Sequence, residues 1–98
     1  MKTMTTAEVQ RAMESGTALK LIDVREVEEV EVGHIPGILN IPLSVLETRI
    51  PELDKGEKYI VVCRSGNRSG MATQLLEGHG FDATNMVGGM LEWQGEVK

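Results

Sequence analysis

A single cysteine offers this chain its clearest means of doing chemistry. Cys63 is the only cysteine among 98 residues, and it follows an apolar run over 59–62 that predicts a short buried strand. Small and polar residues come next, and the apolar spacing beyond them predicts a helix over 69–77. A strand, a short loop and a helix in this order bring backbone N–H groups to one point. We therefore expect the strand to deliver a thiol to that point.

The residues after Cys63 favour its reactive form. A cysteine reacts as its thiolate, and a helix N-terminus or nearby cations lower its pKa from about 8.5 to between about 3.5 and 7.5. Arg64 and Arg68 supply two cations, and Gly66 permits a tight turn and a close approach of backbone to a ligand. Three short polar side chains complete the loop: Ser65, Asn67 and Ser69. The pattern predicts an anion cradle with a nucleophile at its base.

A buried structural cysteine is the alternative interpretation, because free cysteine is among the most buried residue types. The apolar strand before Cys63 and the two arginines soon after it favour the nucleophile.

The segment Cys-Arg-Ser-Gly-Asn-Arg-Ser over 63–69 resembles the active-site loop of the rhodanese (thiosulfate sulfurtransferase) family. In that family a cysteine is followed by four residues, an arginine and usually a serine that opens the next helix. Other segments resemble the family's N-terminal signature: Leu21–Arg25, Gly33–Gly37 and Asn40–Pro42. Three further features resemble its C-terminal signature: Gly80-Phe81, Gly88-Gly89 and Trp93. The matches extend over residues 19–93 in the family's order.

The resemblance implies a fold and a reaction. The fold is α/β, a three-layer α/β/α domain with a central five-stranded, mainly parallel sheet, here one domain over residues 1–98. The reaction is sulfur transfer, in which Cys63 takes a sulfane sulfur from thiosulfate or a similar small anionic donor. Cys63 then carries the sulfur as a persulfide and passes it to cyanide or a thiol. The resemblance implies no cofactor and no metal.

The two arginines of the loop have separate expected roles. By resemblance, Arg68 holds the loop by hydrogen bonding backbone carbonyls or a carboxylate. Arg64 directly follows the nucleophile, so it either faces the mouth of the site and favours an anionic donor or lies in solvent with a long-range effect only. Both alternatives for Arg64 stay open.

Three other polar residues are expected to support the site. Asp23 and Arg25 end a strand predicted over 19–24, on the side of a parallel sheet where ligands bind. The family uses this segment as scaffold, so we interpret the two residues as an ion pair that fixes the adjoining loop. His34 has the chemistry of a general base for a cysteine, but the resemblance implies that it holds a turn through hydrogen bonds.

Helix-capping and helix-breaking residues predict the boundaries of the remaining helices and strands. Thr5 and Glu8 have the spacing of a capping box, and Ser15-Gly16 ends the helix that they open. Ser44 and Glu47 have the same spacing and predict a helix over 45–50. Gly78-His79-Gly80 ends the helix over 69–77 and supplies a glycine suited to the left-handed position after it. Other elements are predicted at 2–4 (edge strand), 26–32 (one or two helical turns), 38–41 and 83–87 (strands), and 90–94 (a helix packed on the body through Trp93).

Composition sets limits on function. The net charge of −5 disfavours general binding to nucleic acid or to an anionic membrane. One cysteine excludes an internal disulfide framework and a multi-cysteine metal site. A free thiol suits a reducing compartment, and we find no signal sequence or membrane-spanning apolar run, so we expect a cytoplasmic protein.

Two other functions remain as alternatives. Rhodanese-like phosphatases and arsenate reductases carry five residues between cysteine and arginine, which makes room for a tetrahedral oxyanion, whereas this chain has four. The second alternative is a regulatory or sulfur-relay module that docks a specific protein acceptor. It shares the persulfide chemistry, and nothing in the sequence separates it from the enzyme.

Overall fold

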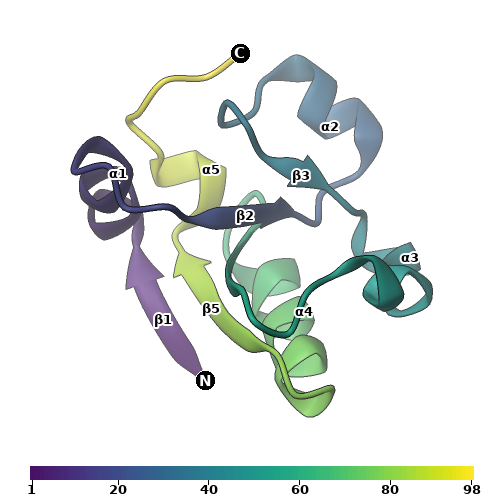
Figure 1. Cartoon of the computed structure of the whole chain (residues 1–98). Helices are drawn as coiled ribbons and strands as arrows, with labels where there is room; N and C mark the ends of the chain where they lie inside the picture. Colours follow the sequence, from purple (N-terminus) through teal and green to yellow (C-terminus); the bar gives the residue numbers. More distant parts are fainter.

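Five parallel strands form one sheet at the centre of the computed structural model, which describes all residues, 1–98 (Figure 1). Their order across the sheet is β1-β5-β4-β2-β3, and every neighbouring pair is parallel. The strands are β1 (Lys2–Thr5), β2 (Lys20–Asp23), β3 (Leu39–Asn40), β4 (Lys58–Val62) and β5 (Asp82–Val87). Since β4 is the middle strand, the cysteine that follows it lies at the centre of the sheet's carboxyl edge.

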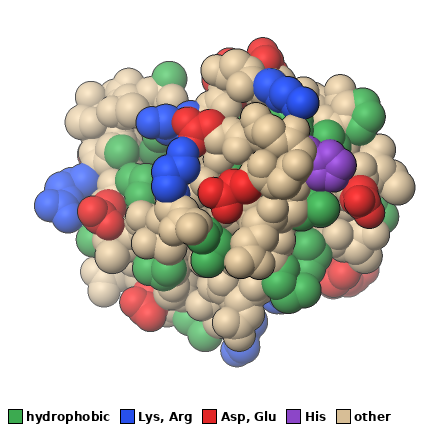
Figure 2. All heavy atoms as spheres, turned by 90° about the horizontal axis from the view of Figure 1, so that it is seen from below, with side chains coloured by type: hydrophobic (Ala, Val, Ile, Leu, Met, Phe, Trp, Pro, Cys, Tyr) green, Lys and Arg blue, Asp and Glu red, His purple; other side chains and the backbone are tan.

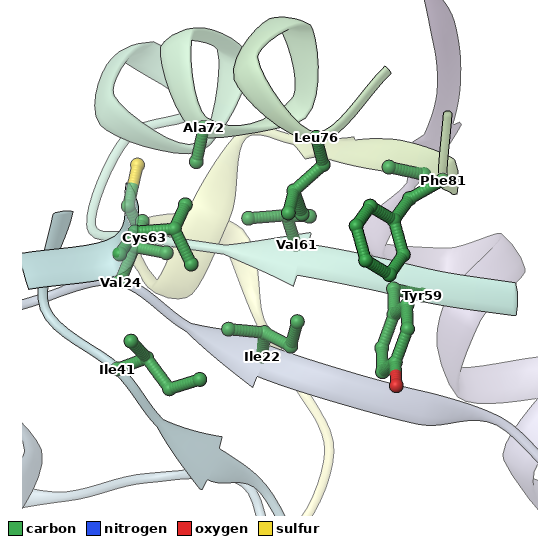
Figure 3. Close-up of a cluster of buried hydrophobic side chains, with 11 residues drawn as sticks. Ile22, Val24, Ile41, Tyr59, Val61, Cys63, Ala72, Leu76 and Phe81 are labelled. Carbon is green, nitrogen blue, oxygen red and sulfur yellow. The ribbon is translucent and has the colours of Figure 1, made fainter. Parts of the chain in front are cut away.

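Helices cover both faces of the sheet. They are α1 (Thr6–Glu14), α2 (Val27–Val32), α3 (Leu43–Arg49), the 3₁₀ turn η1 (Ile50–Glu52), α4 (Asn67–Gly78) and α5 (Gly89–Glu92). On one face, Val61 packs in a buried cluster with Leu46 of α3 and Leu76 of α4 (Figure 3). On the other face, Ile60 clusters with Val9 of α1. Alternate residues of β4 thus serve opposite layers, as a strand covered on both sides requires, and the predicted three-layer fold is confirmed.

Most of the predicted elements are confirmed, including the first capping box. The Thr5 hydroxyl accepts a hydrogen bond from the Glu8 backbone N–H at 3.1 Å, and the Glu8 carboxylate accepts one from the Thr5 N–H at 2.8 Å. Of the two glycines at the predicted end of α4, Gly78 lies in the helix, and Gly80, directly beyond the C-cap, is the left-handed one with φ +87°. Trp93 packs against the cluster beneath α1 and α5.

The predicted capping role of Ser44 is wrong. The helix begins at Leu43, so Ser44 lies inside it, and Pro42 is the N-cap with no side-chain cap. The first helical N–H, that of Leu43, instead donates to the carbonyl of Val24 at 3.0 Å. A tertiary hydrogen bond to the end of β2 thus satisfies the first N–H of the helix, which has no partner within the helix itself.

Two other helix boundaries differ from the predictions. The helix predicted over 69–77 begins at Asn67, so Arg68 and Ser69 lie in its first turn. Its N-cap is Gly66, whose φ of +107° allows the chain to turn sharply into the helix. The final helix is shorter than predicted and covers Gly89–Glu92.

The surface has a mixed character. On the face drawn in Figure 2, acidic and basic side chains are interspersed with apolar ones, and no area of one charge dominates. None of the helices has both the length and the apolar character needed to cross a membrane.

Candidate active site

Cys63 lies at the floor of a loop that turns back over its sulfur. The residue is 1% exposed, and its Sγ accepts a hydrogen bond from the Gly66 backbone N–H at 3.0 Å. Ser69 Oγ lies 3.2 Å from the same sulfur. Figure 3 shows the sulfur pointing toward α4, on the side of Ala72. The strand and the first turn of α4 therefore enclose the thiol between them.

The surroundings of Cys63 act on its pKa in opposite directions. Burial raises the pKa of the thiol, because an ion loses hydration there. The Ser69 hydroxyl and the backbone N–H groups of Ser69, Gly66 and Ser65 hydrogen-bond the thiolate and lower its pKa. The hydrogen bonds outweigh burial, so the pKa of Cys63 lies below its ordinary value. The site thus favours a thiolate in a largely dry setting.

The short helix α5 supports the backbone of the cysteine loop. Met90 N donates to the Cys63 carbonyl at 2.9 Å, and Leu91 N donates to the Arg64 carbonyl at 3.0 Å. Gly89 makes this contact possible, since a Cβ at residue 89 would lie 2.6 Å from the Cys63 carbonyl oxygen. The sequence indicated only a turn at Gly88-Gly89. Its contact with the cysteine backbone requires the tertiary structure.

Arg68 forms a two-armed ion pair with Glu29 of α2. Its Nη1 donates to Glu29 Oε1 at 2.6 Å and its Nη2 to Oε2 at 2.9 Å. The hydrogen bond with Arg68 lowers the pKa of Glu29 to about 2, against a smaller opposing effect of burial. The first turn of α4 is thereby tied to α2. Nothing in the sequence indicated this partner, because Glu29 is one of several glutamates in its segment.

Arg64 has a different setting. Its side chain is exposed and makes no hydrogen bond within the chain, while its carbonyl is held by Leu91. It borders a surface hollow of about 290 Å³. The other residues around this hollow are Arg25, Glu29, Val32, Met90 and Leu91. Of the two loop arginines, Arg64 is therefore the one whose charge is free to meet a ligand.

Asp23 and Arg25 form a buried ion pair at the end of β2. Arg25 Nη2 lies 2.8 Å from Asp23 Oδ2, and Arg25 and Asp23 are 6% and 0% exposed. Arg25 also donates to the carbonyl of Gly33 at 2.8 Å. Asn40 Nδ2 donates to the carbonyls of both Asp23 and Arg25. These contacts join the end of β2 to the turn after α2 and to β3.

His34 lies in that turn and forms no hydrogen bond with the cysteine loop. Its Nδ1 lies 3.0 Å from the carbonyl oxygen of Val30, and its backbone pairs with Lys98 through two hydrogen bonds. None of these bonds reaches residues 63–69. The geometry gives His34 no direct link to the thiol.

Asn85 of β5 is a site residue that the sequence did not indicate. Ser69 Oγ donates to Asn85 Oδ1 at 2.5 Å, and Asn85 Nδ2 donates to the Gly66 carbonyl at 3.2 Å. Asn85 is 4% exposed. A polar residue within a predicted strand of a sheet covered on both faces was the available signal, because a buried amide needs hydrogen-bond partners.

Comparisons with known proteins agree with this geometry. The family model described as "Rhodanese-like domain" matches residues 5–96. The "Putative sulfurtransferase YtwF" of Bacillus subtilis is 40% identical over 98 residues, which are all of this chain and 95% of that protein. The "Putative sulfur carrier protein YrkF" of the same species is 39% identical over 91% of this chain, which spans about half (49%) of that protein.

A solved structure also superimposes closely. The Rhodanese-like domain protein from Staphylococcus aureus has a TM-score of 0.93 and 35% sequence identity. The match covers 98% of this chain and 94% of that one.

Proposed function

The chain belongs to the rhodanese-like domain family of sulfurtransferases and sulfur carriers, and on that premise we propose that Cys63 transfers sulfur through a persulfide. The proposed donor is thiosulfate or a similar small anionic sulfane compound, and the proposed acceptor is cyanide or a thiol. The observation that carries the proposal is the pair of contacts on Cys63 Sγ from Gly66 N and Ser69 Oγ.

These contacts suit the thiolate form of Cys63 in a two-step transfer. In the first step the Cys63 thiolate attacks the outer sulfur of thiosulfate, a new S–S bond forms, and sulfite leaves with the electrons of the old one. In the second step the acceptor attacks the terminal sulfur of the persulfide, and Cys63 leaves as its thiolate. Donors around Sγ stabilise the thiolate that begins and ends the cycle. This is covalent catalysis, and two half-reactions predict ping-pong kinetics.

The loop geometry argues against a phosphatase or an arsenate reductase. Four residues separate Cys63 from Arg68, so the loop is small. Both arms of the Arg68 guanidinium are engaged by Glu29. A phosphoryl group needs bidentate donors that are free to receive it, whereas a single sulfur atom needs only the Gly66 and Ser69 contacts.

A sulfur-relay protein is the second candidate. Arg64 stands beside the exposed aliphatic residues Val32 and Leu91, which are 91% and 61% exposed. Apolar surface next to a reactive group suits a protein acceptor better than a small anion. Under either function we propose that residues 1–98 act as one domain.

Steady-state kinetics test the proposal. Thiocyanate should form from thiosulfate and cyanide, with parallel double-reciprocal lines as cyanide is varied at several thiosulfate concentrations. Cys63→Ser should form none. Wild-type protein that forms no thiocyanate would reject this pair of substrates, and intersecting lines would reject the two-step route. Much faster turnover with a protein thiol than with cyanide would favour the relay.

A further inference from the structure

Ser69 lies between two groups that can each accept a hydrogen bond from its single hydroxyl hydrogen. Its Oγ is 3.2 Å from Cys63 Sγ and 2.5 Å from Asn85 Oδ1. A serine hydroxyl has one hydrogen to donate and lone pairs to accept with. The side chain is fully buried, so no water replaces a missing donor. Ser69 can therefore donate to Asn85 or to Cys63, but not to both.

The Asn85 amide has only one sensible orientation. Its Nδ2 donates to the Gly66 carbonyl at 3.2 Å, which leaves Oδ1 facing Ser69. The reverse orientation would set the amide oxygen against the Gly66 carbonyl oxygen, with no hydrogen between them. Asn85 therefore presents an acceptor to Ser69 and draws the hydroxyl hydrogen toward itself.

The position of Asn85 in the sheet directs its side chain toward Ser69. Asn85 pairs in register with Val61 on β4, so its side chain emerges on the same face as those of Val61 and Cys63. Ser69, in the first turn of α4, covers that face. The chain of contacts runs from β4 through α4 to β5 and returns to the loop at Gly66.

We propose that Asn85 is a positioning residue that competes with Cys63 for the Ser69 hydroxyl hydrogen and so sets the balance between thiol and thiolate. When Ser69 donates to Asn85, its oxygen accepts from the S–H of a neutral Cys63. When the thiol releases its proton to water, the thiolate needs a donor, and the Ser69 hydrogen turns from Asn85 to Sγ. Asn85 then loses its donor, which opposes ionisation. Sulfur transfer from the persulfide returns Cys63 to the thiolate and repeats the exchange.

This inference rests on the proposed role of Cys63 as nucleophile, but its test needs no sulfur donor. Cys63 is the only cysteine, so the pH dependence of alkylation by iodoacetamide reports on this thiol alone. A failure of sulfur transfer and a failure of the Asn85 effect are therefore distinguishable. No sulfur donor is added in this titration, so no persulfide forms and only the thiol and the thiolate are compared.

The experiment is a double-mutant cycle of Asn85→Leu and Ser69→Ala. A leucine side chain at position 85 would offer no acceptor, so Ser69 would be free to donate to the thiolate. Asn85→Leu also removes the hydrogen bond from the Asn85 amide to the Gly66 carbonyl. This loss occurs both with Ser69 and with Ala at position 69, so it cancels in the cycle. We expect Asn85→Leu to lower the pKa of Cys63 alkylation when Ser69 is present. Compared with the shift that the same substitution causes in the Ser69→Ala background, this shift should be lower by about 0.5 to 1 pKa unit. An equal shift in the two backgrounds, or one of opposite sign, would overturn the proposal.

Charged groups near the loop are unchanged in every variant, so they cancel as well. They are Arg64 and Arg68 of the loop, Asp23 and Arg25 at the end of β2, Glu29 of α2 and Glu92 of α5. Thr84→Val is the matched control, because Thr84 is the neighbour of Asn85 in β5 and pairs with Ile60 on the opposite face. It should leave the alkylation profile unchanged.

A second variant covers the case in which Asn85→Leu does not fold, as judged by circular dichroism. Asn85→Asp keeps the shape and presents a stronger acceptor to Ser69. It should raise the alkylation pKa by about one unit or more, partly by direct charge repulsion. The rise should be smaller in Ser69→Ala, where repulsion alone remains. The same rise in both backgrounds would contradict the exchange of the Ser69 hydrogen.

Discussion

Arg68 and Glu29 form a two-armed ion pair, with N–O distances of 2.6 and 2.9 Å, across 39 positions of sequence. The pair joins the helix that follows the nucleophile to α2, which otherwise contributes no buried residue to either core cluster. We therefore propose that Arg68 acts on the site by fixing the loop. This relationship underlies the first two predictions.

Removal of Arg68 should cost more activity than removal of Arg64. Arg68→Ala releases the first turn of α4 and leaves Glu29 without its partner. We expect kcat for thiocyanate formation to fall by about tenfold or more, since a misplaced group is costly in catalysis. Arg64→Ala should mainly raise KM for thiosulfate, because Arg64 is exposed and unpaired. A larger loss of kcat in Arg64→Ala than in Arg68→Ala would reject these assignments.

The ion pair should also make stability depend on pH in acid. Arg68 lowers the pKa of Glu29 to about 2 from its ordinary value of 4.5, so the folded state favours the carboxylate. The stabilisation is present above about pH 4.5 and is lost as the pH falls toward 2. About a third of each side chain is exposed, so solvent screening reduces the contribution to about 1 kcal/mol.

Urea unfolding of wild type and Glu29→Gln measures this dependence. The wild type should be the more stable protein at pH 7, and the difference should shrink through pH 4 and vanish near pH 2. A difference that stays constant over this range would contradict the assigned pKa. Glu52→Gln is a useful comparison, since Glu52 pairs with Arg49 on the exposed surface and makes no hydrogen bond with the loop over 63–69.

Gly89 should tolerate no side chain. It has φ +57°, and a Cβ there would meet the Cys63 carbonyl oxygen at 2.6 Å. Gly16 is a matched control, because it has φ +83° and a Cβ at that position would meet nothing within 4 Å. Gly16→Ala should cost only the backbone strain of about 1–2 kcal/mol. Gly89→Ala should cost clearly more in thermal or urea unfolding and should also reduce the rate of sulfur transfer, and equal losses would refute the contact.

The fold was largely predictable because its signals are local. The capping box at Thr5, the apolar run of β4 and the glycine-containing stop after α4 each act within a few residues of sequence, and each is confirmed. Ser44 shows where local reasoning fails, because the helix begins one residue earlier, at Leu43, whose N–H donates to the carbonyl of Val24. Tertiary contacts of this kind leave no recognisable spacing of residue types in the sequence.

The parts of the site that the sequence indicated are the central loop and the Asp23–Arg25 ion pair. The residues between Cys63 and Ser69 carry a contiguous pattern, and the structure sets Gly66 N and Ser69 Oγ against the sulfur. Glu29 and Asn85 come from distant elements, and Glu29 is one of four glutamates in its segment. Their alignment with the loop depends on how α2 and β5 pack, which sequence spacing alone does not determine.

Mass spectrometry of the intact protein after incubation with thiosulfate tests the central claim most directly. We predict a gain of one sulfur atom that is absent in Cys63→Ser and is lost when cyanide is added. Because the chain has a single cysteine, the added sulfur has one expected place. Wild-type protein that gains no sulfur from thiosulfate or another sulfane donor, or a gain that persists in Cys63→Ser, would contradict a Cys63 persulfide.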